Sequence, residues 1–248
     1  MNNHDFENIC DSLPNSIKMK LNHIKRFLDD GRASVMVGAG FSKNAIMGQS
    51  TNMLDWNSLG KVFFKRLYSR DPESKDLEFT TPMRLASQIE SCFGRNALDE
   101  LIISSLPDLL ARPSDLHISL LRLNWKDVFT TNYDTLLERA SIDSEKHYEF
   151  VTNKETLLYR MPPRIIKLHG SFKNIRPFII TEEDYRKYPQ DHPIFVNTVK
   201  QALIEGLLCL IGFSGNDPNF LSWVGWLRDV IGSHSSPVYL LPYDNTLP

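Results

Sequence analysis

Cysteine is scarce in this chain of 248 residues, which holds only Cys10, Cys92 and Cys209. Three widely separated cysteines exclude a disulfide scaffold and a four-cysteine zinc module, and they favour a reducing compartment. The small secreted proteins that depend on disulfides are thereby excluded, and we expect a cytoplasmic protein.

An excess of charge of either sign is also absent, because 28 Lys and Arg face 30 Asp and Glu. The net charge of -2 provides no overall basic field to hold nucleic acid or an anionic membrane. The longest apolar runs, such as residues 207–213, are far shorter than the ~20 residues that span a bilayer. The polar N-terminus lacks the apolar stretch of a signal peptide. We therefore predict no membrane partner and no direct binding of nucleic acid.

Short apolar runs alternate with helical patterns along the chain. Several runs are apolar nearly throughout, as expected of strands that are covered on both faces. The alternation predicts a doubly wound α/β fold with a parallel, Rossmann-like sheet. The predicted strands are residues 34–37, 127–131, 164–168, 178–181, 207–213 and 238–241. The predicted helices are residues 16–30, 55–67, 82–91, 97–106, 114–121, 134–140, 193–203 and 217–231.

Residues 55–123 carry helical patterns and no convincing strand, and they separate the first two predicted strands by roughly ninety residues. We predict that this segment is a helical insertion packed beside the sheet, with a cleft between the two. It would act either as a lid over the cleft or as a plain structural subdomain. We expect residues 1–248 to form one domain, the N-terminal part of a larger protein.

A glycine turn follows the first strand in the stretch VMVGAGFSKN. Gly38 and Gly40 permit a tight turn, and the helix that follows offers backbone N–H groups to a phosphate. The third glycine of a dinucleotide fingerprint is missing, because Lys43 stands in its place, and no Walker A loop occurs. A strand-to-helix turn without a ligand remains the alternative.

Polar residues also follow two further strands. Asn132 and Asp134 lie in TTNYD, and His169 precedes a glycine in KLHGS. Carboxyl ends of parallel strands share one edge of a sheet, where ligands bind, so we expect these side chains in one crevice. A histidine there can take up a proton near neutral pH. The alternatives are helix capping by Asn132 and Asp134 and a structural role for His169.

A fourth strand ends in GFSGND, where Gly212 and Ser214 form a second turn of small residues, able to admit a ribose or phosphate. Asn216 and Asp217 in the same turn suit a turn and a helix cap equally well.

Together, the motifs GAGFS, TTNYD, KLHGS and GFSGND resemble, in order and character, the sirtuin-like NAD-binding domain over residues 33–241. In that family the first turn holds the NAD diphosphate, and the asparagine and aspartate line the nicotinamide and its ribose. The histidine is catalytic, and the last turn contacts the adenosine side. The resemblance implies that Asn132 and His169 are catalytic. It implies NAD binding by Gly38, Ala39, Gly40, Phe41, Ser42, Asp134, Gly212 and Ser214.

The chain departs from the deacylase sirtuins in three places. Their two zinc-binding cysteine pairs are missing, Thr131 replaces a glutamine, and residues 43–56 lack their proline–aspartate–phenylalanine–arginine segment. The chain is more similar to the sirtuin-like domain of bacterial antiphage effectors, which degrade NAD.

This resemblance implies hydrolysis of NAD+ to nicotinamide and ADP-ribose in abortive infection. It implies no metal, and control by homo-oligomer assembly or by a sensor domain or partner protein. The alternatives are a non-catalytic module that senses NAD or ADP-ribose, and an ADP-ribosyl transferase or cyclase.

Overall fold

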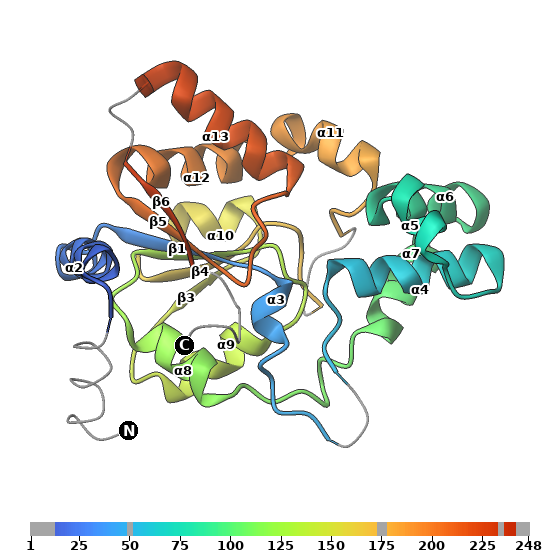
Figure 1. Cartoon of the computed structure of the whole chain (residues 1–248), viewed down its shortest axis with the longest axis horizontal. Coiled ribbons are helices and arrows are strands. Elements are labelled where there is room, and N and C mark those ends of the chain that lie inside the picture. Colours follow the sequence, from blue (N-terminus) through green and yellow to red (C-terminus); the bar gives the residue numbers. More distant parts are fainter. Residues whose placement is uncertain (1–12, 49–51, 173–177, 233–235, 242–248) are drawn as a thin grey trace.

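A six-stranded parallel sheet forms the centre of the molecule (Figure 1), in the order β3-β4-β2-β1-β5-β6. The structure is a computed structural model that describes residues 13–48, 52–172, 178–232 and 236–241. The predicted α/β fold with a parallel sheet is confirmed. The strands are β1 (Ala33–Val37), β2 (Asp127–Thr130), β3 (Glu149–Val151), β4 (Arg164–Lys167), β5 (Leu207–Ile211) and β6 (Val238–Leu241).

The register of the sheet brings the ends of its four central strands level. Val37 of β1 pairs with Thr130 of β2 and with Ile211 of β5, and Thr130 pairs with Lys167 of β4. The residues that follow these strands therefore emerge along one edge of the sheet. The four motifs singled out in the sequence all begin at this carboxyl edge.

Helices cover both faces of the sheet (Figure 1), because successive strand residues point to opposite sides. Met36 and Phe129 pack into the core beneath one helical layer, whereas Val35 and Val128 pack into the core of the other. The first layer consists of α10 (Lys154–Tyr159), α11 (Glu182–Asp191), α12 (Pro193–Glu205) and α13 (Pro218–Ile231). The second consists of α2 (Asn15–Asp29), α3 (Ala39–Ser42), α8 (Asp115–Arg122) and α9 (Leu136–Ala140).

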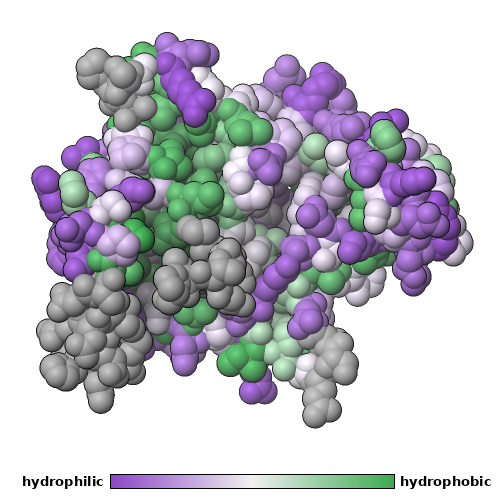
Figure 2. Space-filling view, in the orientation of Figure 1, coloured by the Kyte–Doolittle hydropathy of each residue, from purple (hydrophilic) through white to green (hydrophobic). Residues whose placement is uncertain are grey.

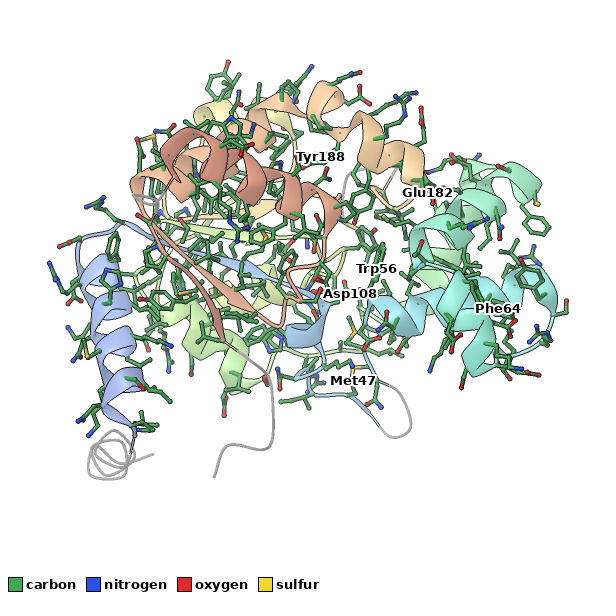
Figure 3. All side chains as sticks on the ribbon, turned by 45° about the horizontal axis from the view of Figure 1, so that its top comes forward. Met47, Trp56, Phe64, Asp108, Glu182 and Tyr188 are labelled. Atoms are coloured by element: carbon green, nitrogen blue, oxygen red, sulfur yellow. The ribbon has the colours of Figure 1, made fainter. Side chains whose placement is uncertain are left out.

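Four helices between β1 and β2 form a group beside the sheet (Figure 1). They are α4 (Trp56–Tyr68), α5 (Ser74–Phe79), α6 (Pro82–Phe93) and α7 (Arg95–Ser105). Asp55 caps α4 by accepting a hydrogen bond from the Ser58 amide, as its residue type predicts. Trp56 packs against both the core of this group and the core of the first layer (Figure 3). The segment expected as an insertion, residues 55–123, also includes α8, which packs on the sheet.

An ion pair and hydrogen bonds connect the helical group to α11 and the residues just before it. The Arg95 guanidinium on α7 contacts the Asp184 carboxylate at 3.0 Å and donates to the Phe178 carbonyl. The Glu182 amide donates to the Ser87 hydroxyl of α6 at 3.0 Å. These contacts join the helical group to the element that carries part of the candidate site.

The predicted strand at residues 178–181 is wrong, because this segment leads into α11 without pairing in the sheet. Its side chains are buried like those of a strand. The Ile179 amide donates to the His169 carbonyl, just beyond β4, at 3.1 Å. The next two amides, of Ile180 and Thr181, both donate to the Asp184 carboxylate at 3.0 Å and not to a strand. The sequence patterns also missed β3, α5, α10 and α11, which are short or largely polar.

Apolar side chains gather on the surface over β6 (Figure 2), which is an edge strand of the sheet. Leu240 on this strand exposes 57% of its surface. None of the helices in the described part of the chain is long and apolar enough to cross a membrane.

Candidate active site

Three glycines bring the turn after β1 against the turn after β5. A Cβ on Gly38 would lie 2.5 Å from the carbonyl oxygen of Gly212, and one on Gly40 would lie 2.8 Å from the same atom. Gly212 has a φ of +58°, and its own Cβ would lie 2.2 Å from the Phe41 nitrogen. Contact between two protein backbones is therefore sufficient reason for glycine at all three positions.

The amides of the glycine turn are largely engaged within the protein. Gly38 donates to the Ile211 carbonyl at 3.1 Å, Gly40 donates to Gly212 at 3.0 Å, and Phe41 donates to Gly38 at 3.0 Å. The expectation that this turn offers free N–H groups to a phosphate is therefore wrong for these three amides. The assignment of the turn to the NAD diphosphate stays a prediction.

Ser42, Asn132 and Asp134 form one buried hydrogen-bond network between β1 and β2. The Asn132 amide donates to the Ser42 hydroxyl at 2.9 Å, and that hydroxyl donates to the Asp134 carboxylate at 2.7 Å. The other carboxylate oxygen of Asp134 accepts the Leu136 amide at 3.1 Å. The capping alternative thus describes part of the role of Asp134, but it is wrong for Asn132, whose side-chain amide points to Ser42.

Tyr133, between these two residues, turns the opposite way. Its ring completes the core of the helical group, and its hydroxyl donates to the Ile179 carbonyl at 2.8 Å. One strand end therefore supplies both the polar network and the contact with the neighbouring helices.

A buried ion pair supports the network from β4. Lys167 is 2% exposed, and its ammonium lies 3.4 Å from a Glu138 carboxylate oxygen and donates to the Asp134 carbonyl. Burial raises the pKa of Glu138, and the Lys167 charge opposes that rise. Sequence reasoning missed this pair, although a lysine inside the apolar run RIIKL was its signal.

His169 follows β4 and is almost completely buried, with 1% of its surface exposed. Its ring packs edge-on against Tyr185 and Tyr188 of α11 (Figure 3 labels Tyr188). Nδ1 lies 3.5 Å from the Tyr185 hydroxyl, which lies 3.0 Å from an Asp217 carboxylate oxygen. Burial lowers the pKa of His169, while the Asp217 charge partly opposes this. The imidazole is therefore neutral at neutral pH.

The structure divides the predicted site residues between the two sides of the sheet edge. Asn132 and His169 each follow a paired strand residue by two positions, Thr130 and Lys167 respectively. Their side chains diverge, however, because Asn132 turns toward Ser42 on α3 while His169 turns toward α11. Ser214 is exposed, and its hydroxyl accepts the Asn216 amide at 3.3 Å, as in a simple turn.

Four buried side-chain atoms in the described residues have no hydrogen-bond partner: His117 Nε2, Glu138 Oε2, His169 Nε2 and Asn219 Nδ2. His169 follows β4, Asn219 lies at the start of α13, the helix after β5, and Glu138 lies on α9, the helix after β2. His117 packs on Phe41 in the turn after β1, with 4.8 Å between ring centroids. Buried polar atoms ordinarily have partners, so these atoms mark the carboxyl edge as a place for a polar ligand or water.

His117 is a buried neighbour of the site that the sequence patterns did not single out. Its Nδ1 accepts the Ser114 amide at 3.2 Å in a capping box, so Nε2 carries the proton that has no partner. Burial lowers its pKa to about 4, with Asp134 opposing and Arg139 reinforcing this shift. The single histidine in an amphipathic helix gave no signal that distinguished it from a surface residue.

His117 is expected to make folding pH-dependent. In the unfolded chain it has its ordinary pKa of 6.5, so below that pH the unfolded state binds a proton that the folded state excludes down to about pH 4. The free energy of unfolding should therefore fall by about 3 kcal/mol between these pH values. His117→Gln keeps a capping-box acceptor and should remove this part of the loss in urea titrations. An unchanged pH dependence in the variant would contradict this account.

Two surface hollows, of about 390 and 300 Å³, lie at the opposite, amino edge of the sheet. The lining of the 390 Å³ hollow includes the Asp127–Arg164 ion pair, whose atoms are 2.7 Å apart. Ligands of parallel sheets bind at the carboxyl edge, so these hollows are not the candidate site. Within the described residues, no group of three or more His, Cys, Asp and Glu side chains is placed to hold a metal ion.

A parallel sheet with helices on both faces, and with polar residues collected at its carboxyl edge, defines the class of Rossmann-like nucleotide-binding folds. Residues 126–246 match the family model described as SIR2-like domain. Just under half of the chain is therefore similar to that family. The glycine turn at Gly38 lies outside the matched residues, although β1 belongs to the same sheet.

The chain is also similar to several bacterial proteins. It is 26% identical to an NAD(+) hydrolase ThsA of Enterococcus faecium, over 88% of this chain and 45% of the relative. It is 27% identical to an NAD(+) hydrolase ThsA of Acinetobacter baumannii, over 82% of this chain and 40% of the relative. It is 24% identical to Defense-associated sirtuin 2 of Bacillus subtilis, over 87% of this chain and 21% of the relative. The chain therefore spans less than half the length of these relatives.

Proposed function

We propose that this chain is an NAD+ hydrolase that depletes NAD+ in antiphage defence. The observation that carries the proposal is a neutral histidine, His169, whose Nε2 has no partner at the edge of the sheet where dinucleotides bind. The names of its relatives, NAD(+) hydrolase and defense-associated sirtuin, support the same activity and the same setting.

The reaction requires one general base and a held substrate. The bond that breaks joins C1′ of the ribose to the pyridinium nitrogen, and its electron pair returns to that nitrogen, so nicotinamide leaves as a neutral molecule. Water adds its oxygen to C1′ and loses one proton. The products are nicotinamide, ADP-ribose and one proton. Since the leaving group is already cationic, no metal has to activate it, and acid–base chemistry with good positioning is sufficient.

In this proposal His169 takes the proton from water or from a ribose hydroxyl at Nε2. Asn132 orients the water or the ribose, and Asp134 holds the carboxamide or the ribose. Both residues are positioned beforehand by Ser42, whose hydroxyl contacts them at 2.9 and 2.7 Å. The remaining predicted contacts with the dinucleotide are Gly38, Ala39, Gly40, Phe41, Gly212 and Ser214.

The proposal is tested by incubating the purified chain with NAD+ and identifying the products by liquid chromatography and mass spectrometry. We expect equal amounts of nicotinamide and ADP-ribose, at the same rate with and without EDTA. Loss of activity in EDTA, restored by a divalent metal, would contradict the metal-free mechanism. The relatives are more than twice as long, so the assay should include the full-length gene product and a range of protein concentrations. We propose that assembly or a partner region raises the activity.

A non-catalytic NAD+ or ADP-ribose sensor is the second candidate, and the burial of His169 favours it. With 1% of its surface exposed, His169 meets substrate only after its surroundings open. Tight binding of NAD+ without turnover, in the full-length protein as well, would select the sensor. An ADP-ribosyl transferase or a cyclase differs only in the nucleophile, and the masses of the products separate both from a hydrolase.

A further inference from the structure

His169 is the first member of a chain of side chains that continues through Tyr185 to Asp217. Nδ1 of His169 lies 3.5 Å from the Tyr185 hydroxyl, and that hydroxyl lies 3.0 Å from the nearer Asp217 carboxylate oxygen. The three residues come from the end of β4, from α11 and from the N-cap of α13. Their contacts therefore depend on how two helices pack over the sheet.

We propose that Tyr185 and Asp217 are positioning residues that hold His169 as the tautomer with its proton on Nδ1 and a free lone pair on Nε2. The proposal rests on the proposed function, in which Nε2 is the base. Nothing in the sequence motifs assigned a role to Tyr185, and Asp217 was predicted only as a turn or cap residue.

The direction of the hydrogen bonds follows from what each group can donate. An ionised carboxylate only accepts, so the Tyr185 hydroxyl gives its proton to Asp217. The tyrosine oxygen then has only lone pairs left for His169, so Nδ1 must carry the proton. The other Asp217 oxygen accepts the Phe220 amide at 3.0 Å, which fixes the carboxylate.

The distance of 3.5 Å between Nδ1 and the tyrosine oxygen is long for a hydrogen bond. Such contacts in catalytic sites often tighten only when substrate is bound. The rest of the assembly is well fixed, since α11 begins with a capping box between Thr181 and Asp184. Arg95 ties that same Asp184 to α7. These contacts fix the position of Tyr185 relative to the His169 imidazole.

The surroundings of His169 act on its pKa in opposite directions. Burial is the largest influence and lowers the pKa, as does His192, whereas the charges of Asp217 and Asp184 raise it. When Nε2 takes a proton, the new positive charge lies one hydroxyl group away from Asp217. The proton on Nδ1 stays in place and hydrogen-bonds to Tyr185, so no proton has to reach the carboxylate.

Tyr185→Phe tests the proposal, and Tyr188→Phe is its matched control. Both tyrosines lie on α11, are buried and pack edge-on against His169, but the Tyr188 hydroxyl donates to the Leu168 carbonyl at 2.8 Å. In ¹⁵N-histidine-labelled wild-type protein, long-range ¹H–¹⁵N spectra should show His169 protonated on Nδ1. Tyr185→Phe should shift His169 toward the other tautomer, whereas Tyr188→Phe should leave it unchanged. The His169 signals are assigned by their loss in His169→Gln.

The kinetic readout separates positioning from a general structural defect. Tyr185→Phe is expected to lower kcat by ~10–100-fold with little change in KM, as substitutions behind a catalytic histidine commonly do in metal sites. The Tyr185 hydroxyl accepts a hydrogen bond from the imidazolium, so its removal should lower the pKa of His169. The acidic limb of the pH–rate profile should therefore move to lower pH. Asp217→Asn keeps an N-cap residue on α13 and should move the limb in the same direction. Tyr188→Phe should leave both kcat and the limb as in the wild type.

Two results would overturn the proposal. One is His169 protonated on Nε2 in the wild type, and the other is a Tyr185→Phe variant that keeps the wild-type tautomer and pH profile. The tautomer is read without substrate and in the wild type, so it decides the proposal even if Tyr185→Phe fails to fold. Absence of NAD+ turnover in the wild type would instead contradict the proposed function and leave the tautomer result valid.

Discussion

Replacement of His169 by glutamine is expected to lower kcat for NAD+ cleavage by ~10²–10⁴-fold, the usual contribution of a general base. Glutamine is close to histidine in size, so it fills the same buried space, but it cannot take up a proton near neutral pH. The NAD+ dissociation constant should change little, because the base acts on water or a hydroxyl during the reaction. Nicotinamide release gives the rate, and calorimetry gives the affinity.

His192→Gln is the control for this substitution, because His192 lies on the same side of the sheet and packs on Tyr188 at 4.8 Å between ring centroids. It should retain the wild-type rate. Circular dichroism and urea unfolding should establish that both variants are folded. A folded His169→Gln variant with the wild-type rate would remove His169 from the mechanism.

The second large effect is expected from Gly38→Ala, which should lower the free energy of unfolding by about 1–3 kcal/mol or more. The added methyl group would lie 2.5 Å from the Gly212 carbonyl oxygen and 2.7 Å from the Phe213 Cα. Both atoms belong to the backbone, so relief requires that the turn after β5 moves away from the turn after β1. The same movement would separate the two turns predicted to hold the dinucleotide, so NAD+ affinity should fall as well.

Gly225→Ala is the matched control for Gly38→Ala. Gly225 lies inside α13, and a Cβ there would meet no atom within 4 Å. The substitution should stabilise the protein by about 0.5–1 kcal/mol, because alanine favours the helix over glycine. If Gly38→Ala keeps the wild-type stability and loses only NAD+ affinity, the glycine serves the ligand and not the packing of the two turns.

The apolar runs of the sequence were sufficient to predict most of the sheet. Five of the six strands were predicted within a few residues, because β1, β2, β4, β5 and β6 lie in short runs of mainly apolar or β-branched residues. The failure at residues 178–181 has a physical cause. Burial of Phe178 and Ile180 produced a strand-like pattern, but Asp184 satisfied the backbone amides that a neighbouring strand would have paired.

The sequence by itself determined which residue types stand at the strand ends, and hence the glycine turns and the positions of Asn132, Asp134 and His169. Only the tertiary structure decided what each side chain contacts. Ser42 meets Asp134 across 92 positions of sequence, and Tyr185 meets Asp217 across 32. The burial of His117 and the separation of Asn132 from His169 were likewise decided by packing. Periodicity and caps report the chemistry of near neighbours in the chain, whereas hydrogen bonds across the sheet edge depend on the order of the strands and on which helical layer each side chain faces.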